Sequence, residues 1–564
     1  MLALPGAAQE FRGTIQGRVT DQHGAAIPHA PVLVTNEETG VASEALTEAD
    51  GAYAAPFLVP GRYRVEVALA GFKKFVRSGI AVGVGQRAPV DITLALGELA
   101  ETVEVRAEVS LLDRASGALG QTIDVKRVED MPLNGRMIFM LNRLAAGVNW
   151  QVPTFGATGT SGLRPFDNGG GSAWSINGGQ VSTNEFLLDG APNSTRGRYN
   201  FGPPVDAVEE FRIQTNTYDA QYGHTGGGVV NMTLKSGTNA FRGQAWNFLK
   251  NERLNANDVL NASQGAPKPP YQANQYGATI RGPIVRGRTF YMGTFEGLRE
   301  RVPFPQTASV PTEAERRGDF SQSYTDQRTP LVIYDPLTTT CNASGQCTRT
   351  PFPNNVIPPD RLNPVALRLL ALYPLPTVPG QRLNNFVNPV NTGRYDYDSE
   401  LGRIDHNFSD ASKLFVSLHH NHRDEFRSTN GMQGTFANQG QWPQTRINRG
   451  GTADWVRVMG SRTMLNLRGG YTWFTEDAAQ RQAMEYDRSA LGFRNLPGTY
   501  LPRIGLDQYN VPGSTTTSFG VGSDGRGTSD QTTSRIDRTS GSSTAFSSCR
   551  SGGTDCLDGT SRPW

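Results

Sequence analysis

The strongest constraint on this chain is the alternation of apolar and polar residues in several strand-length segments after residue 239. The segments are residues 241–249, 275–284, 288–298, 401–408, 413–422, 452–459 and 462–474. In the last segment one face of an extended strand would carry Leu465, Leu467, Gly469, Tyr471 and Trp473, and the opposite face Asn466, Arg468 and Thr472. A period of two residues predicts antiparallel strands, either in a soluble sheet or in the wall of a membrane β-barrel.

Composition and charge exclude several classes of protein. The 564 residues carry a formal net charge of +2, so no basic excess points to nucleic acid as a partner. No apolar stretch approaches the ~18 residues that a transmembrane helix needs. Glycine (64 residues) and proline (35 residues) are abundant, but their share stays below the roughly 25–30% that is typical of low-complexity disorder. The chain is therefore expected to form packed β domains.

Residues 13–97 are predicted to form a β-sandwich, because short alternating segments are separated by turn residues at close spacing. The segment resembles the carboxypeptidase regulatory-like domain, a prealbumin-like sandwich. The resemblance rests on Gly17–Asp21, Gly24–Pro28, Thr47–Tyr53, Leu58–Tyr63 and Gly71–Phe72. It implies no catalytic residues. Tyr53, Tyr63 and Phe72 are expected to be core residues or, as an alternative, residues that stack on sugars.

Residues 98–108 are an extended, acidic stretch rich in β-branched residues. Such a stretch is either a linker strand or a peptide that adds to the edge of a partner's sheet. Further motifs follow at residues 185–193, 208–214, 218–223 and 226–239. In the last motif three consecutive glycines would permit unusual backbone conformations and a close approach of neighbouring chains.

These motifs resemble, in the same order, the plug domain of TonB-dependent outer-membrane receptors of the Oar-like class. The resemblance implies an α+β plug over residues 109–239. The plug motif comprises Leu188, Asp189, Gly190, Ala191, Tyr222, Gly223, Gly226, Gly227, Gly228 and Asn231. The resemblance also marks a TonB-box candidate in the linker, formed by Thr102, Val103, Glu104, Val105, Arg106 and Ala107.

By the same resemblance, residues 240–510 are part of a transmembrane antiparallel barrel with long loops. Receptors of this class close with about twenty-two strands, and the chain shows about seven, so it is expected to be a C-terminally truncated fragment. The proline-rich stretch from about residue 301 to residue 398 would be an extracellular loop. Within it, Cys341 and Cys347 are candidates for a disulfide in an oxidising compartment.

The two ends of the chain differ from the rest. Residues 1–12 are expected to be the remnant of a signal peptide, because small residues follow a short apolar run. Residues 511–564 are rich in Ser, Thr and Gly, and are expected to be a disordered tail or the product of a frameshift.

No motif for an enzyme, a cofactor or a metal is recognised. His420, His422 and Asp424 would share one face of a strand, and a polar lumen wall or loop is favoured there over a metal site.

The combined prediction is a mainly β protein like a TonB-dependent receptor, in a Gram-negative outer membrane, with the sandwich in the periplasm. Its expected partners are membrane lipid, a TonB-type energy-transducing protein and an unidentified extracellular ligand. The intact protein would import a solute such as an oligosaccharide or a peptide. The alternatives are a surface interaction or adhesion protein, and a carbohydrate-binding module without transport.

Overall fold

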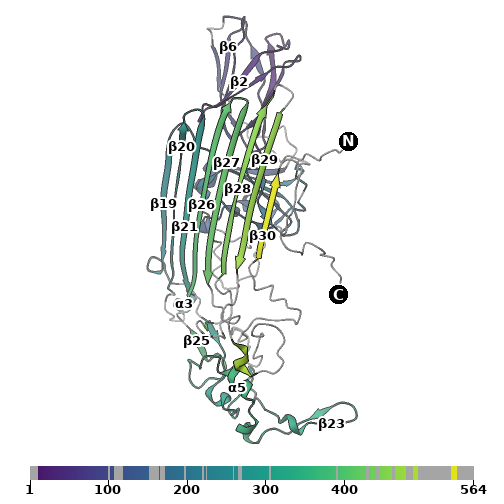
Figure 1. Cartoon of the computed structure of the whole chain (residues 1–564), viewed down its shortest axis with the longest axis vertical. Coiled ribbons are helices and arrows are strands. Elements are labelled where there is room, and N and C mark those ends of the chain that lie inside the picture. Colours follow the sequence, from purple (N-terminus) through teal and green to yellow (C-terminus); the bar gives the residue numbers. More distant parts are fainter. Residues whose placement is uncertain are drawn as a thin grey trace.

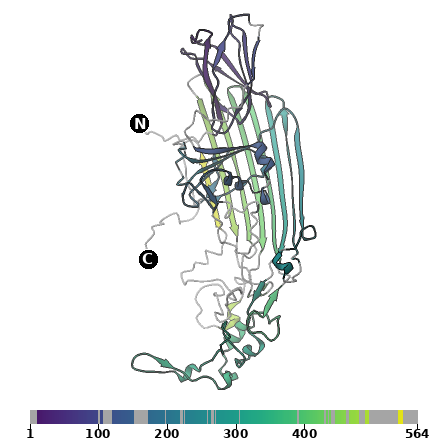
Figure 2. The same ribbon diagram turned by 180° about the vertical axis from the view of Figure 1, so that it is seen from behind.

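A computed structural model of the chain describes residues 11–98, 102–106, 119–131, 133–150, 164, 172–195, 198–218, 222–223, 225–257, 259–263, 268, 270–303, 306–388, 392–426, 431–432, 435, 437, 444–459, 464–477, 487–492 and 535–542. Figure 1 shows a small β-sandwich at one end, a tall sheet in the middle and a loop-rich unit at the other end. Figure 2 shows the plug lying against one face of the tall sheet. Within the described part, no helix has the length and apolar character needed to cross a membrane.

The N-terminal sandwich consists of two sheets. The first contains β1 (Gly13–Asp21), β4 (Ala52–Leu58), β7 (Arg87–Pro89) and β8 (Ile92–Leu94). The second has the order β3 (Ala42–Leu46), β2 (Pro31–Asn36), β5 (Gly61–Val67), β6 (Lys74–Val82) and β9 (Thr102–Arg106). Alternate residues of the strands point inward and form one apolar core, as the period of two requires.

Tyr53 and Tyr63 belong to this core. The two residues are 4% and 3% exposed, and their hydroxyls donate to the carbonyl oxygens of Val90 and Val59, each at 2.7 Å. Buried rings with satisfied hydroxyls have no face left for a sugar. The stacking alternative is therefore wrong for these two residues, because burial in the sandwich decides their role.

The plug is built on a five-stranded sheet with the order β10 (Leu119–Asp124), β17 (Val208–Asn216), β18 (Val229–Leu234), β13 (Glu185–Leu188) and β14 (Ala191–Pro192). The smaller elements around it are α1 (Val125–Asp130), η1 (Asn134–Arg136), η2 (Ile138–Leu144), β11 (Val148–Trp150), β12 (Trp174–Ile176), β15 (Ser194–Thr195), β16 (Arg198–Tyr199) and η3 (Val205–Ala207). Aromatic and aliphatic side chains from these elements form an apolar core of the plug's own, joined by only two residues of the wall.

Eight strands form the tall sheet, hereafter the wall, and each pairs antiparallel with the next in chain order. They are β19 (Arg242–Asn251), β20 (Gln272–Val285), β21 (Thr289–Pro303), β26 (Thr392–Ser409), β27 (Ser412–Phe426), β28 (Gln444–Val458), β29 (Met464–Asp477) and β30 (Arg535–Ser542). All seven predicted strands are present, and β30 lies in the segment expected to be a tail. The mainly β fold class is confirmed.

Side chains of the wall alternate between the face that holds the plug, hereafter the inner face, and the opposite outer face. In β27, Asn421 and Arg423 are buried on the inner face, so His420 and His422 lie on the outer face. The expectation that these histidines line a polar lumen is wrong. A period of two tells which residues share a face but not which face meets the plug.

The loop-rich unit spans residues 306–388, between β21 and β26. Its elements are β22 (Gln306–Ala308), α4 (Glu313–Arg316), η5 (Pro336–Thr338), β23 (Thr340–Cys341), β24 (Cys347–Thr348), η6 (Pro353–Asn355), η7 (Pro359–Arg361), α5 (Pro364–Leu370) and β25 (Phe386–Asn388). Cys341 and Cys347 form a disulfide. The remaining helical segments of the described chain are η4 (Glu252–Leu254), α3 (Val259–Ser263) and η8 (Arg488–Leu491).

Candidate functional site: the plug turn and its partners in the wall

The centre of the candidate site is a two-residue turn of the plug. β13 and β14 form a hairpin in which Leu188 pairs with Ala191. Asp189 and Gly190 between them have φ angles of 48° and 71°. Two positive φ angles in a two-residue hairpin loop define a type I′ turn, and Asp-Gly is among its preferred sequences. The Leu-Asp-Gly-Ala motif is therefore explained first by local backbone geometry.

The side chain of Asp189 stabilises this turn by accepting hydrogen bonds from two different strands. Its Oδ1 atom accepts a hydrogen bond from the backbone N–H of Leu234, at 3.0 Å. Its Oδ2 atom accepts one from Nη1 of Arg403 in wall strand β26, also at 3.0 Å. The residue is fully buried. Burial raises the pKa of the Asp189 carboxyl, although the charge of Arg403 acts in the opposite direction.

Arg403 is the main partner of the turn in the wall. Its side chain is 1% exposed, and its Nε and Nη2 atoms donate to the carboxylate of Asp405 at 2.8–3.1 Å. Its guanidinium also lies over the ring of Phe415, at 4.3 Å from the centroid. Two carboxylates and an aromatic face thus surround one buried cation, which compensates much of the cost of desolvating it.

A second arginine of the wall reaches the same turn. Arg468 in β29 donates from Nη1 to the carbonyl oxygen of Gly190, at 3.3 Å. Its Nε atom donates to Oδ2 of Asp454, at 2.5 Å. The other oxygen of Asp454 accepts from Arg12, at 2.9 Å, just before the first sandwich strand. One buried network of charges therefore connects the plug, the wall and the N-terminal domain.

The glycines of the plug motif act through close packing. A Cβ atom on Gly228 would lie 2.7 Å from a side-chain carbon of Ile176 and 2.8 Å from the carbonyl oxygen of Gln214. A Cβ atom on Gly227 would lie 2.2 Å from Asn184, whereas one on Gly226 meets only ordinary contacts. None of the three has a positive φ angle. Close approach is therefore the role of Gly227 and Gly228, and the expected unusual backbone conformation is wrong.

The remaining motif residues lie beside these glycines. Tyr222 is 7% exposed and packs with Leu187 and Val229. Gly223 has open space where a Cβ atom would be. Asn231 in β18 is buried, and neither polar atom of its side chain has a hydrogen-bond partner among the described residues. The motif thus serves the turn, the close packing of β18 and the plug core, rather than one shared chemical centre.

The sandwich also contacts the plug directly. Both carboxylate oxygens of Glu210 in β17 accept from the backbone N–H of Val84, at 2.8 and 2.9 Å, and Arg212 donates to the Val84 carbonyl oxygen. Burial raises the pKa of Glu210 to about 7. The charges of Glu209 and Asp124 raise this pKa further, and the Val84 N–H and the charge of Arg212 oppose the shift.

The candidate TonB-box segment lies in the sandwich sheet. Residues Thr102–Arg106 form β9, which pairs parallel with β6 over Lys74–Ser78. Ala107 lies outside the described residues. The sequence allows this segment to be a linker strand or an added strand on a partner's sheet, and in the structure it is an added strand on a sheet of its own chain.

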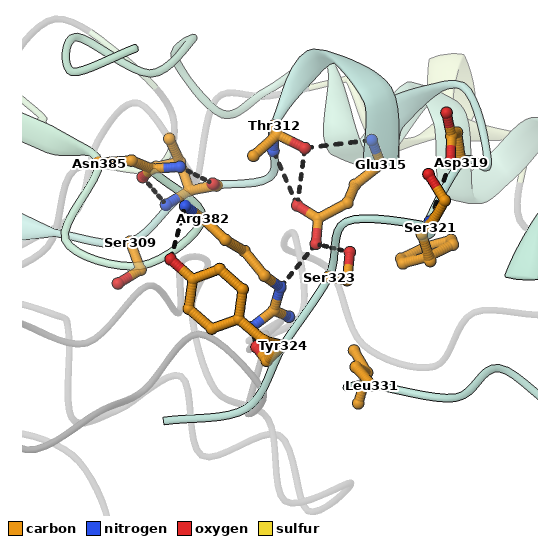
Figure 3. Close-up of polar contacts among 12 residues, drawn as sticks. Ser309, Thr312, Glu315, Asp319, Ser321, Ser323, Tyr324, Leu331, Arg382 and Asn385 are labelled. Carbon is orange, nitrogen blue, oxygen red and sulfur yellow. Dashed lines mark hydrogen bonds and ion pairs between the residues drawn. The ribbon is translucent and has the colours of Figure 1, made fainter. Parts of the chain in front are cut away.

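The loop-rich unit has its own polar centre, shown in Figure 3. Glu315 in α4 accepts from Nε of Arg382 and from the hydroxyl of Ser323, both at 2.7 Å. Its other oxygen accepts from the backbone N–H of Thr312, at 2.9 Å, which completes a capping box. The side chains of Glu315 and Arg382 are 3% and 4% exposed. These contacts give a long loop a defined structure.

Sequence reasoning missed the partners of the plug turn. Arg403, Arg468 and Asp454 lie on wall strands, where the only available signal was a charged residue on the polar face. Among the described residues, no group of three or more His, Cys, Asp or Glu side chains is arranged to hold a metal ion.

Comparisons with known proteins identify the families to which two parts of the chain belong. Residues 233–542 match the outer membrane beta barrel domain family, and residues 14–95 match the carboxypeptidase regulatory-like domain. The first match covers more than half of the chain. The chain therefore belongs to the outer membrane β-barrel family and carries an N-terminal carboxypeptidase regulatory-like domain.

Individual relatives have low sequence identity to this chain. The TonB-dependent transporter Oar of Myxococcus xanthus is 26% identical over 337 residues, which are 57% of this chain and 30% of that protein. The chain thus matches less than a third of that relative's length. The transporter YddB from Escherichia coli has a TM-score of 0.38 and 11% identity, with 63% of this chain and 39% of that one covered. The siderophore receptor PirA from Acinetobacter baumannii has a TM-score of 0.32 and 14% identity, with 66% and 47% covered. The expected resemblance to TonB-dependent receptors is confirmed by the family matches and the Oar relative.

Proposed function

We propose that the protein binds an extracellular solute and imports it across the outer membrane with energy from a TonB-type partner. The observation that carries this proposal is the attachment of the plug turn. Asp189 and Gly190 are held to the wall by hydrogen bonds to Arg403 and Arg468, while the plug keeps an apolar core of its own.

This arrangement suits a plug that moves. Each hydrogen bond between charged groups that is replaced by contacts with water costs about 1.5–3 kcal/mol. Separation of a large apolar interface would cost roughly 25 cal/mol for each Å² exposed. A plug with its own core and a polar attachment therefore keeps its fold when the attachment opens. A passive adhesion protein has no need of this property.

The outer face of the wall supports contact with membrane lipid. Ile280, Ile404, Leu418 and Tyr471 are each at least half exposed there. In the proposed orientation the sandwich lies in the periplasm, and the loop-rich unit, at the opposite end of the wall, faces the outside. The segment 102–107 would be the part that the energy-transducing partner binds.

The solute class proposed is an oligosaccharide or a peptide. Uncharged polar side chains on the inner face support this choice. Ser399 and Asn421 are fully buried, and neither polar atom of the Asn421 side chain has a hydrogen-bond partner among the described residues. Amides and hydroxyls of this kind offer hydrogen bonds to neutral polar solutes without requiring a charge.

The test is uptake of fluorescent oligosaccharides and peptides by cells that carry the outer-membrane protein. Deletion of residues 102–107 is expected to abolish uptake and to leave binding at the cell surface unchanged. The control is deletion of the exposed residues 342–346 between the two cysteines, which should leave uptake intact. Uptake that survives the deletion of residues 102–107 would refute the energised import proposed here.

Adhesion at the cell surface is a second candidate, favoured by one observation. Val332, Tyr334 and Leu337 of the loop-rich unit are 44%, 50% and 78% exposed. Exposed apolar side chains that form a contiguous patch mark an interaction site. Adhesion without any uptake, lost on changing Tyr334 and Leu337 to Ser, would favour this function over import.

A further inference from the structure

Strand β9 is the exceptional strand of the second sandwich sheet. It lies at the end of the strand order, so no strand of the described chain pairs with its other edge. It runs parallel to β6, with Lys74 paired with Thr102 and Ser78 with Arg106. The other three pairs of this sheet, β2 with β3, β2 with β5 and β5 with β6, are antiparallel.

The chain reaches β9 by crossing from one sheet of the sandwich to the other. β8 pairs with β1 in the first sheet. Directly after β8, the carbonyl oxygen of Ala95 accepts from the N–H of Lys73, at 2.8 Å, and Leu96 forms a bridge with Phe72. The chain is therefore already at the start of β6 before β9 begins.

Two consequences follow from this position. First, β9 covers an edge of β6 that would otherwise expose a row of unpaired backbone groups. Second, the backbone groups of β9 that pair with β6 are of the kind through which an extended peptide adds to a partner's sheet. A parallel pair is slightly less stable per residue than an antiparallel one. The five residues of β9 pair with β6 in this weaker, parallel arrangement. They can therefore leave β6 and pair with a partner's strand that offers a longer or an antiparallel edge.

We propose that the edge of β6 is a binding site for residues 102–106, and that it competes with the energy-transducing partner for this strand. The inference rests on the proposed function, in which the same segment couples the protein to that partner. The kind of partner it fits is a protein with an open sheet edge that takes up β9 as β6 releases it. The N-terminal domain then sets the fraction of molecules whose coupling segment is accessible.

The experiment locks β9 in place with a disulfide. Val76 and Glu104 are directly paired residues of β6 and β9, so Val76→Cys and Glu104→Cys together would join the two strands. The probe is the soluble periplasmic domain of a TonB-type protein, and its affinity for the whole chain is measured with and without reductant. Oxidation is expected to weaken binding by at least tenfold, because the accessible fraction multiplies the affinity, and reduction is expected to restore it.

A matched control joins two other strands of the same sheet. Leu33 and Glu44 are paired in β2 and β3, so Leu33→Cys with Glu44→Cys gives a disulfide that does not involve β9. This variant also reports any effect of reducing the Cys341–Cys347 disulfide. Its affinity for the probe is expected to be independent of reductant.

The outcomes separate the inference from the function on which it rests. A synthetic peptide of residues 102–107 is tested against the same probe. If the peptide binds and the oxidised protein binds as well as the reduced protein, the partner uses the free edge of β9 and the competition is refuted. If the peptide does not bind, the segment is not the coupling element, and the proposed energising step fails together with the inference.

Discussion

The buried contact between Asp189 and Arg403 can be tested by the substitution Asp189→Asn. Asn adopts the left-handed φ of 48° found at this position at least as readily as Asp does. The turn should therefore persist, and its amide oxygen still accepts from the N–H of Leu234. What is lost is the negative charge that faces Nη1 of Arg403, 3.0 Å away.

The expected cost follows from what remains around Arg403. Removing one partner of an isolated buried ion pair costs about 3–5 kcal/mol. Here Asp405 still pairs with the guanidinium through Nε and Nη2, so the loss is closer to that of one charged hydrogen bond, about 1.5–3 kcal/mol. We expect the attachment of the plug to weaken by about 2 kcal/mol, and the plug core to remain intact.

Hydrogen exchange at the amides of β18 measures this loss, because Leu234 lies at the end of that strand. A cost of about 2 kcal/mol predicts exchange that is roughly 30-fold faster through local opening. The control is Asp326→Asn in an exposed turn of the loop-rich unit, which should leave these amides unchanged. Exchange within twofold of the unchanged protein would refute the reasoning that this contact holds the plug.

Three further predictions concern other contacts. Since the folded pKa of Glu210 is raised to about 7, its contribution to stability is fully present below about pH 4.5 and is lost as pH rises through 7. Glu210→Gln should therefore flatten the pH dependence of the denaturation midpoint between these values, and an unchanged slope would contradict this. Glu315→Ala leaves the buried Arg382 without its carboxylate and should destabilise the loop-rich unit by about 3–5 kcal/mol, seen as rapid proteolysis within residues 306–388; resistance equal to that of the parent would count against it. Gly228→Ala forces atoms within 3.0 Å to shift and should cost about 1–3 kcal/mol in urea unfolding, whereas Gly223→Ala, which meets open space, should cost less than about 0.5 kcal/mol.

Local patterns account for the parts of the fold that depend on neighbouring residues. The wall strands follow from the alternation of apolar and polar residues, and β19 to β21 and β26 to β29 overlap the seven predicted segments. The structure extends β26 back to Thr392, into the stretch expected to be a loop. The pairing of β26 with β21 and β27 explains the extension, because ladder hydrogen bonds come from neighbouring strands and leave no mark on the local sequence.

The candidate site also combines a feature that local sequence predicts with contacts that it does not predict. The Asp-Gly turn is encoded by two adjacent residues, since only they must adopt positive φ angles. The partner of Asp189 is 214 residues away along the chain, and nothing near Arg403 indicates which plug residue it meets. The pairing depends on which wall residues face the plug, and a shift by one residue would turn Arg403 to the other face.

By itself, the sequence determined the strands of the sandwich, the Asp-Gly turn and the strands of the wall, because each rests on spacing within a short window, whereas the plug motif was predicted from a family resemblance. Only the tertiary structure decided that Arg403 and Arg468 hold the turn, that Glu315 pairs with Arg382, and that residues 102–106 lie on β6. These contacts join segments that are far apart in the chain. Their geometry arises from the packing of whole sheets and loops, which no local pattern of residues specifies.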